Sequence, residues 1–222
     1  MSNILLSEKK NKLNNFFPQS MESLEFENNP SITIVKNFEL IINYIKDKQL
    51  KLSENRLFLQ PKDLFQLNLQ LLNPIEIDIQ KPQPSSLPHV NAIFWLLRTT
   101  KMVKILRIKN NLFMEINHDI LNEWITLNKT EQYCTLLDAW LASAKSILID
   151  NNRGTDSIAM FNCVGTFLRM SQIVNVSDDN IASHNYLLGM YNLALFEMFG
   201  FLKIKHEEPN PGKELILFSV VL

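Results

Sequence analysis

Apolar residues recur along much of this chain at intervals of three and four, the spacing of a helix that buries one face. The first such stretch follows Pro30-Ser31, with apolar side chains at positions 34, 35, 38, 41, 42 and 45. Two short extended segments, Leu50–Ser53 and Leu57–Gln60, then flank a polar turn. Pro61 suits the first position of a second helix, whose leucines continue to Leu72.

A loop rich in Pro and Ser precedes a third predicted helix, which Ser85 or Ser86 can cap. The apolar stripe of this helix consists of Val90, Ile93, Phe94 and Leu97. The run Val103–Ile116 contains two β-rich segments around Asn110-Asn111, a pair that tolerates positive φ, and it therefore predicts a hairpin. Asp119 is expected to cap the next helix, which carries Leu121, Trp124 and Ile125.

Three helices followed by a hairpin are typical of a winged helix, in which the hairpin is the wing. The C-terminal part repeats this scheme, with helical spacing over Tyr133–Leu141, Ile158–Leu168 and Ile181–Phe199. Gly200 suits the left-handed C′ position of the last helix, and a second hairpin follows. We therefore predict a mainly α fold with short β-hairpins, of the α+β class, built from tandem winged-helix-like units. The expected organisation is an N-terminal docking arm over residues 1–30, a first unit over 31–146 and a second over 147–222.

The composition is that of a folded protein, because 46% of the 222 residues are hydrophobic and the chain has 9 prolines and 5 glycines. Its 22 basic and 23 acidic residues exclude the strongly basic profile of a nucleic-acid coat protein. Two cysteines exclude a disulfide framework and any metal site that needs four thiolates. The N-terminal apolar run Ile4–Leu6 is too short for a signal peptide, and no run approaches a membrane span. We therefore expect a cytoplasmic protein without a membrane partner.

One segment departs from the balanced charge of the chain. From Ile79 to Met114 there is no acidic residue, whereas six cations occur, namely Lys81, Arg98, Lys101, Lys104, Arg107 and Lys109. In a winged helix the last five would lie on the recognition helix and wing and could meet phosphates, with Arg107 and Lys109 on one strand face. Asn91 and Thr99 or Thr100 are the candidates for reading bases. The same cations could instead bind an acidic protein, or simply form a solvated face near a helix C-terminus.

Motifs for chemistry are missing from the sequence. The four histidines lack metal-ligand spacing, and there is no nucleophile elbow and no glycine-rich phosphate loop. We therefore predict no catalytic residue, no cofactor and no metal. The expected function is a non-enzymatic interaction or regulatory module with a protein partner or self-association, and the alternative is a DNA-binding winged helix that uses Arg98, Lys101, Lys104, Arg107 and Lys109.

The segments Lys51–Leu71 and Trp95–Leu141 resemble bacterial proteins of the plasmid open-reading-frame-three-like family. The similar motifs fall at Lys51–Ser53, Leu97–Arg98, Trp124–Ile125, Glu131–Gln132 and Leu136–Leu141. The resemblance covers roughly residues 30–145 and, more faintly, the C-terminal hairpin. It implies a winged-helix-like region and a link with plasmids and mobile elements, but no activity, since the family is uncharacterised. This chain departs from the family where glycines are expected, at Lys101–Met102, Asn110–Asn111 and His118.

Overall fold

The computed structural model describes residues 33–54, 57–142, 190–201, 203–206 and 218–221. The chain divides into two units, Met1–Pro30 and Ser31–Leu222. The predicted N-terminal arm, the helix predicted over Ile158–Leu168 and the predicted boundary between residues 146 and 147 lie outside the described residues. Within the described part of the chain, no helix is both long and apolar enough to cross a membrane.

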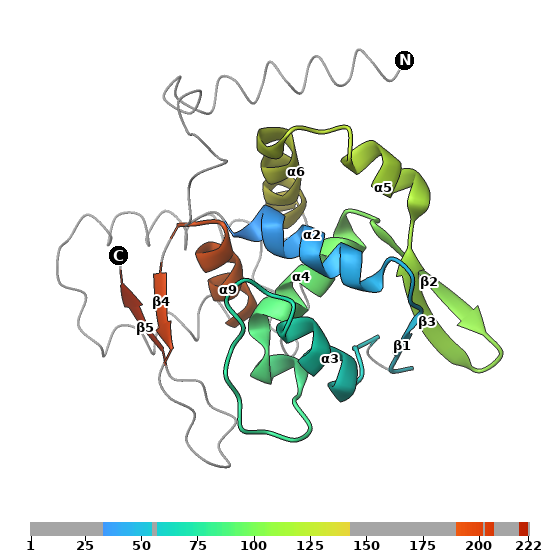
Figure 1. Ribbon diagram of the computed structural model, residues 1–222, viewed down its shortest axis with the longest axis horizontal. Helices are drawn as coiled ribbons and strands as arrows, with labels where there is room; N and C mark the ends of the chain where they lie inside the picture. Colours follow the sequence, from blue (N-terminus) through green and yellow to red (C-terminus); the bar gives the residue numbers. More distant parts are fainter. Residues whose placement is uncertain (1–32, 55–56, 143–189, 202, 207–217, 222) are drawn as a thin grey trace. The chain divides into compact units, whose positions relative to one another are not determined.

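The described residues are mainly helical with a small antiparallel sheet, which confirms the predicted α+β class. In chain order the elements are α2 (Ile34–Ile45), β1 (Leu50–Leu52), α3 (Pro61–Asn68), the 3-10 helix η2 (Pro84–Ser86), α4 (Pro88–Thr99), β2 (Val103–Ile108), β3 (Asn111–Ile116), α5 (His118–Trp124), α6 (Lys129–Ala142), α9 (Met190–Met198), β4 (Lys203–His206) and β5 (Phe218–Val221) (Figure 1). The first five predicted helices and the first predicted hairpin are therefore present. The strands of the second hairpin also pair antiparallel, β4 with β5.

The first hairpin belongs to a three-stranded sheet in the order β1-β3-β2. Strand β1 belongs to the first of the two extended segments predicted on either side of a turn, and it pairs with β3 so that Leu50 lies opposite Met114 and Leu52 opposite Leu112. All four side chains are buried. Because cross-strand neighbours share a face of the sheet, these residues form a continuous apolar face across β1 and β3.

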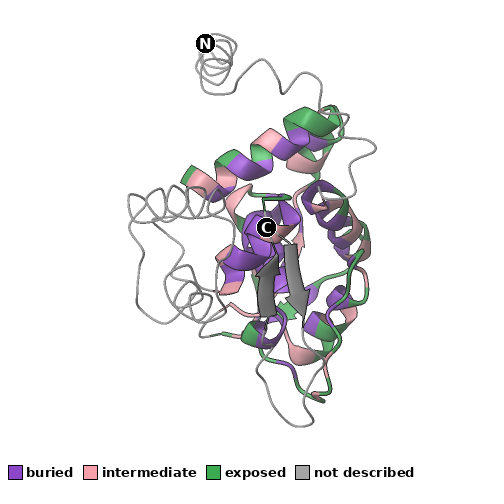
Figure 2. Cartoon of the chain, turned by 90° about the vertical axis from the view of Figure 1, so that its left-hand side faces the viewer, coloured by how far each residue is buried: buried purple, intermediate pink, exposed green. Residues whose placement is uncertain are grey.

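Helix α4 is buried on all sides. Every residue from Pro88 to Leu97 is buried, and α4 contacts α2, α3, α6, α9 and η2 (Figures 1 and 2). The predicted stripe of Val90, Ile93, Phe94 and Leu97 is buried, but it is only part of the buried surface of this helix. The other sides of the helix also carry apolar side chains, such as Trp95 and Leu96, and a helix that is apolar all round is a core helix.

The predicted serine cap of α4 is wrong. Leu87 occupies the N-cap position and Pro88 the first helical position, where proline lacks only an N–H that would have no helical partner. Ser86 belongs instead to η2, where its hydroxyl oxygen accepts a hydrogen bond of 3.2 Å from the backbone N–H of Gln83.

Helix α9 joins this core through aromatic contacts with α6. The Trp140 indole stacks on Phe199 with ring centroids 5.2 Å apart, and meets Phe196 edge-on at 5.0 Å. The Tyr133 hydroxyl donates a 3.0 Å hydrogen bond to the Phe199 carbonyl, and burial raises the pKa of Tyr133 above its ordinary value. The helices α6 and α9, far apart in sequence, therefore share one buried interior.

The end of α9 confirms the C′ position predicted for Gly200, whose φ is 79°. The N–H of Gly200 donates to the Glu197 carbonyl, and that of Phe201 donates to the Phe196 carbonyl. These two bonds, with the contact between the Phe196 and Phe201 rings, form a Schellman motif. The motif satisfies helix-end carbonyls that would otherwise lack partners.

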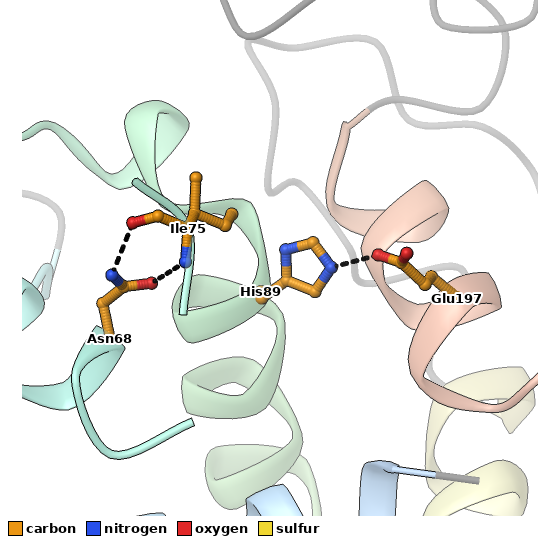
Figure 3. A network of polar contacts seen from close by, with 4 residues as sticks. All are labelled: Asn68, Ile75, His89 and Glu197. Carbon is orange, nitrogen blue, oxygen red and sulfur yellow. Dashed lines mark hydrogen bonds and ion pairs between the residues drawn. The ribbon is translucent and has the colours of Figure 1, made fainter. Parts of the chain in front are cut away.

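Helix α3 ends at Asn68, earlier than the leucine pattern predicts, and Leu69 and Leu72 are exposed beyond it. The buried Asn68 side chain donates to the Ile75 carbonyl at 2.8 Å and accepts from the Ile75 N–H at 3.1 Å (Figure 3). The Leu72 N–H donates to the Asn37 side-chain oxygen at 2.9 Å. These bonds stabilise a turn in the chain, so the leucines after Asn68 do not continue the helix.

Two further helix starts differ from the prediction. Asn117, not Asp119, occupies the N-cap position of α5, and Asp119 lies in the first turn, where its negative charge is favourable. At the start of α6 the Asn128 side chain accepts from the Glu131 N–H, and the Glu131 carboxylate accepts from the Asn128 N–H. This reciprocal capping box was not predicted, although the spacing of the two residues matches the motif.

Candidate functional site

The cations singled out in the sequence lie on one continuous stretch of chain, from the end of α4 through β2 to the turn before β3. We call the five residues on it the basic edge: Arg98, Lys101, Lys104, Arg107 and Lys109, all of which are exposed. The sixth cation of the acid-free segment, Lys81, is not part of it. Lys81 instead lines a groove of about 400 Å³ beside α3.

The arginine at the end of α4 is held against an apolar neighbour. Its guanidinium carbon lies 5.8 Å from the centroid of the Phe94 ring, within the range of a cation–π contact. Partial desolvation by the surrounding protein lowers the pKa of Arg98 from its ordinary value. An arginine nevertheless remains charged in proteins, so this contact orients the cation without removing it.

Lys104 is the cation of the basic edge that acidic groups compensate. Its ammonium lies 3.7 Å from an Asp119 carboxylate oxygen, and Glu115 is its cross-strand neighbour on β3. Of the described residues, no carboxylate forms an ion pair with Lys101, Arg107 or Lys109. The free positive charge therefore gathers at the end of α4 and at the tip of the hairpin.

Two lysines of the basic edge have a backbone conformation that favours glycine. Lys101, at the C′ position of α4, has φ 58°, and Lys109, the first residue of the two-residue turn between β2 and β3, has φ 54°. The expectation that Asn110-Asn111 supplies the positive φ is wrong, because Asn111 already begins β3. Lys109 thus lies in the turn and not on a strand face shared with Arg107. A side chain with a Cβ destabilises each such position by about 1–2 kcal/mol relative to a right-handed backbone.

Asn117 holds the start of the hairpin in place and was not identified from the sequence as part of the site. Its backbone N–H donates to the Met102 carbonyl at 2.8 Å, and its side-chain amide donates to the Lys101 carbonyl at 3.2 Å. These bonds tie the end of β3 to the end of α4. The position of Lys101 is therefore fixed by the sheet as well as by the helix.

The residues proposed to read bases are not available on this surface. Asn91 lies inside the core on α4, with 4% of its surface exposed. The Thr100 hydroxyl donates to the Leu96 carbonyl at 2.8 Å, and Thr99 is half-buried. The sequence signal for this burial is the apolar run around Asn91, whereas the helices that cover α4 are distant along the chain.

The remaining polar groups of the described residues are spread over the fold. Among the described residues, no three His, Cys, Asp or Glu side chains gather to hold a metal. His89 contacts Glu197 at 2.6 Å between α4 and α9 (Figure 3). Burial raises the pKa of the Cys134 thiol, which disfavours the reactive thiolate. The groove beside α3 is lined by Pro61, Lys62, Phe65, Gln66, Gln80 and Lys81, so two lysines are the ionisable side chains of this lining.

Comparisons of the chain with protein-family models, with curated proteins and with solved structures found no match. The basic edge therefore has to be interpreted from its own chemistry.

The backbone at Lys101 gives a direct prediction. Replacement by glycine and by alanine removes the same charge, but only glycine also removes the Cβ. We expect Lys101→Gly to be more stable than Lys101→Ala by about 1 kcal/mol, the reverse of their order inside an ordinary helix. Urea unfolding followed by circular dichroism measures the difference. An alanine variant as stable as the glycine variant would contradict the left-handed conformation of residue 101.

Proposed function

We propose that this protein is a non-enzymatic interaction module that binds an acidic partner protein through the basic edge. The observation that carries the proposal is that Lys101 and Lys109 occupy backbone positions where glycine would be more stable. Backbone strain is enriched at functional sites, and of the three positive-φ residues other than glycine in the described chain, Leu57, Lys101 and Lys109, two are cations of the basic edge. Both side chains are exposed and form no ion pair with a described carboxylate, so their charge is available to a partner.

We further propose that α2 to β3 form a winged-helix-like unit. The element order helix, strand, helix, helix, strand, strand, together with the sheet order β1-β3-β2, supports this interpretation. The hairpin of β2 and β3 would be the wing, and α4 would correspond to the recognition helix. The antiparallel pair β4 and β5 after α9 supports a second helix-hairpin arrangement of the same kind. The resemblance to plasmid-associated proteins suggests a regulatory role connected with mobile elements.

A protein partner is favoured over DNA by the burial of α4. A recognition helix reads bases by entering the major groove, which requires an exposed face. Here α2, α3, α6 and α9 surround α4, and its polar residue Asn91 is buried. The basic edge can still reach phosphates, so DNA binding without base recognition is the second candidate.

The experiment compares two variants with equal net charge. One replaces Lys101, Lys104, Arg107 and Lys109 by glutamine; the control replaces the exposed Lys36, Lys46, Lys62 and Lys81. Binding of a fluorescent acidic peptide and of a short DNA duplex is measured from about 50 to 200 mM salt. We expect the first variant to bind the peptide at least about tenfold more weakly, a loss of about 1.4 kcal/mol, and the control to bind like the original protein.

Equal peptide binding by both variants would overturn the proposal. The DNA alternative would be established in its place if the original protein bound the duplex more tightly than the peptide, if this binding weakened steeply with salt, and if only the first variant lost it.

A further inference from the structure

Strand β2 forms one edge of the three-stranded sheet. In the part of the chain that the structure describes, no strand pairs with the other side of β2. The strand is exposed from Lys104 to Ile108 except at Leu106, which is half-buried. An accessible edge strand presents backbone donors and acceptors to which another extended chain can pair.

The register shows which backbone groups face outward. The Asn117 N–H donates to the Met102 carbonyl, so residues 102 and 117 form a hydrogen-bonded pair. This pair continues the register of the ladder, in which Lys104 lies opposite Glu115 two positions further along. Hydrogen-bonded positions alternate along an antiparallel ladder, so even-numbered residues of β2 bond to β3. The N–H and C=O groups of Ile105 and Arg107 are consequently directed toward the open side.

The side chains of the same edge combine positive charge with exposed apolar groups. Arg107 shares one face of the sheet with Ile105, which is 36% exposed. Lys104 shares the other face with Leu106 and with Ile108, which is 42% exposed. Charged side chains alone would discourage pairing at an edge, whereas apolar side chains between them offer surface that a paired strand would cover.

From these observations we infer that the acidic partner binds as an extended strand that adds to the open edge of β2. The added strand carries acidic side chains opposite Lys104, Arg107 and Lys109, and apolar side chains opposite Ile105, Leu106 and Ile108. Backbone hydrogen bonds to Ile105 and Arg107 provide affinity, and the order of charges provides specificity. The inference rests on the proposed function and adds the conformation and residue pattern of the partner.

Two other occupants fit the edge less well. A second copy of β2 would place two strands that both carry Lys104 and Arg107 side by side, so the new pair would join two positively charged edges, which is unfavourable. A DNA backbone would neutralise the cations but has no donor for the outward carbonyls of Ile105 and Arg107.

The test uses a capped peptide with the sequence glutamate, valine, glutamate, valine, valine, glutamate. Paired antiparallel to β2, its residues lie opposite positions 109 to 104 in that order, with each glutamate opposite a cation. Two control peptides have the same sequence and charge, but alternate amides are methylated, the odd ones in one peptide and the even ones in the other. An added strand turns only one set of amides toward β2. We therefore expect one methylated peptide to bind like the parent and the other at least about tenfold more weakly.

Hydrogen exchange of the intact protein gives an independent readout. With the parent peptide at saturation, the amides of Ile105 and Arg107 are expected to exchange at least about tenfold more slowly, because a bonded amide exchanges only when the bond opens. The amides of Lys104 and Leu106, already bonded to β3, serve as internal controls. The variant Ile105→Pro removes one outward donor and should lose peptide affinity, whereas Ile105→Ala should retain most of it. Because exchange is measured on the unchanged protein, the test stands even if the proline variant does not fold.

Strand addition would be overturned if all three peptides bound the original protein equally well. If all three also failed to bind the variant that replaces Lys101, Lys104, Arg107 and Lys109, the acidic-partner function would remain intact. Absence of binding by any acidic peptide would overturn both. Unchanged exchange at Ile105 and Arg107 under saturating peptide would also refute strand addition.

Discussion

Replacing Trp140 by alanine is expected to lower the free energy of unfolding by about 3–5 kcal/mol. The indole is 1% exposed, stacks on Phe199, meets Phe196 edge-on and donates a 3.1 Å hydrogen bond to the Asn192 side chain. The substitution removes these contacts and leaves a cavity between α6 and α9. Urea unfolding followed by far-ultraviolet circular dichroism measures the change.

Two controls make the Trp140 result specific. Trp140→Phe keeps an aromatic ring but loses the indole donor, so an intermediate loss is expected. Ile125→Ala shortens an apolar side chain that is 67% exposed and should change stability by less than about 0.5 kcal/mol. If Trp140→Ala were as mild as Ile125→Ala, the aromatic cluster would not hold α9 in the core, and the argument that α4 is unavailable to DNA would lose its support.

Replacing Asn68 by alanine is expected to destabilise the protein by about 2–3 kcal/mol. The amide is the partner of both backbone groups of Ile75, and all these atoms are in the buried part of the structure. Removing it leaves a donor and an acceptor desolvated without partners, which is more unfavourable than the loss of a solvated hydrogen bond.

Asn37→Ala is the matched comparison, because it removes the partner of one backbone group, the Leu72 N–H, in a partly buried setting. We expect about half the loss of stability seen for Asn68→Ala. Hydrogen exchange adds a local measurement, since the Ile75 amide should exchange faster in Asn68→Ala and the Leu72 amide in Asn37→Ala. Equal stability losses in the two variants would show that the two hydrogen bonds at Ile75 do not act as described.

Local patterns in the sequence were sufficient to place the helices α2 to α6 and the first hairpin. Spacing of apolar residues defines α2, and the paired β-rich segments define β2 and β3. Pairing of β1 with β3 could not be predicted, because Leu50–Leu52 is short and its partner lies some sixty residues later. Helix ends were predicted less accurately, since Asn68 and Asn117 act through bonds to backbone groups that only the folded chain brings near.

The burial of α4, in contrast, was indicated by the sequence. Val90 to Leu97 is apolar at all positions except Asn91, and a stripe of four residues understates this pattern. What the sequence could not supply was the identity of the covering helix, α9, which depends on contacts across a long separation.

The basic edge itself was identified from the sequence by the run of cations without acids. Its geometry was not, for two physical reasons. Positive φ was assigned to asparagines by residue preference, whereas the helix end and the turn impose it on Lys101 and Lys109. The partial neutralisation of Lys104 depends on Asp119, which lies near it only because α5 starts beside the sheet.

The covering of α4 by α9 also has a consequence for synthesis on the ribosome. About 90 residues separate the end of α4 from the start of α9. At about 5–20 residues per second, the apolar side of α4 that faces α9 waits roughly 5–20 s for its cover after it is made. During this interval the nascent chain presents a hydrophobic surface of the kind that chaperones bind, so yield in the cell should depend on translation speed between these helices.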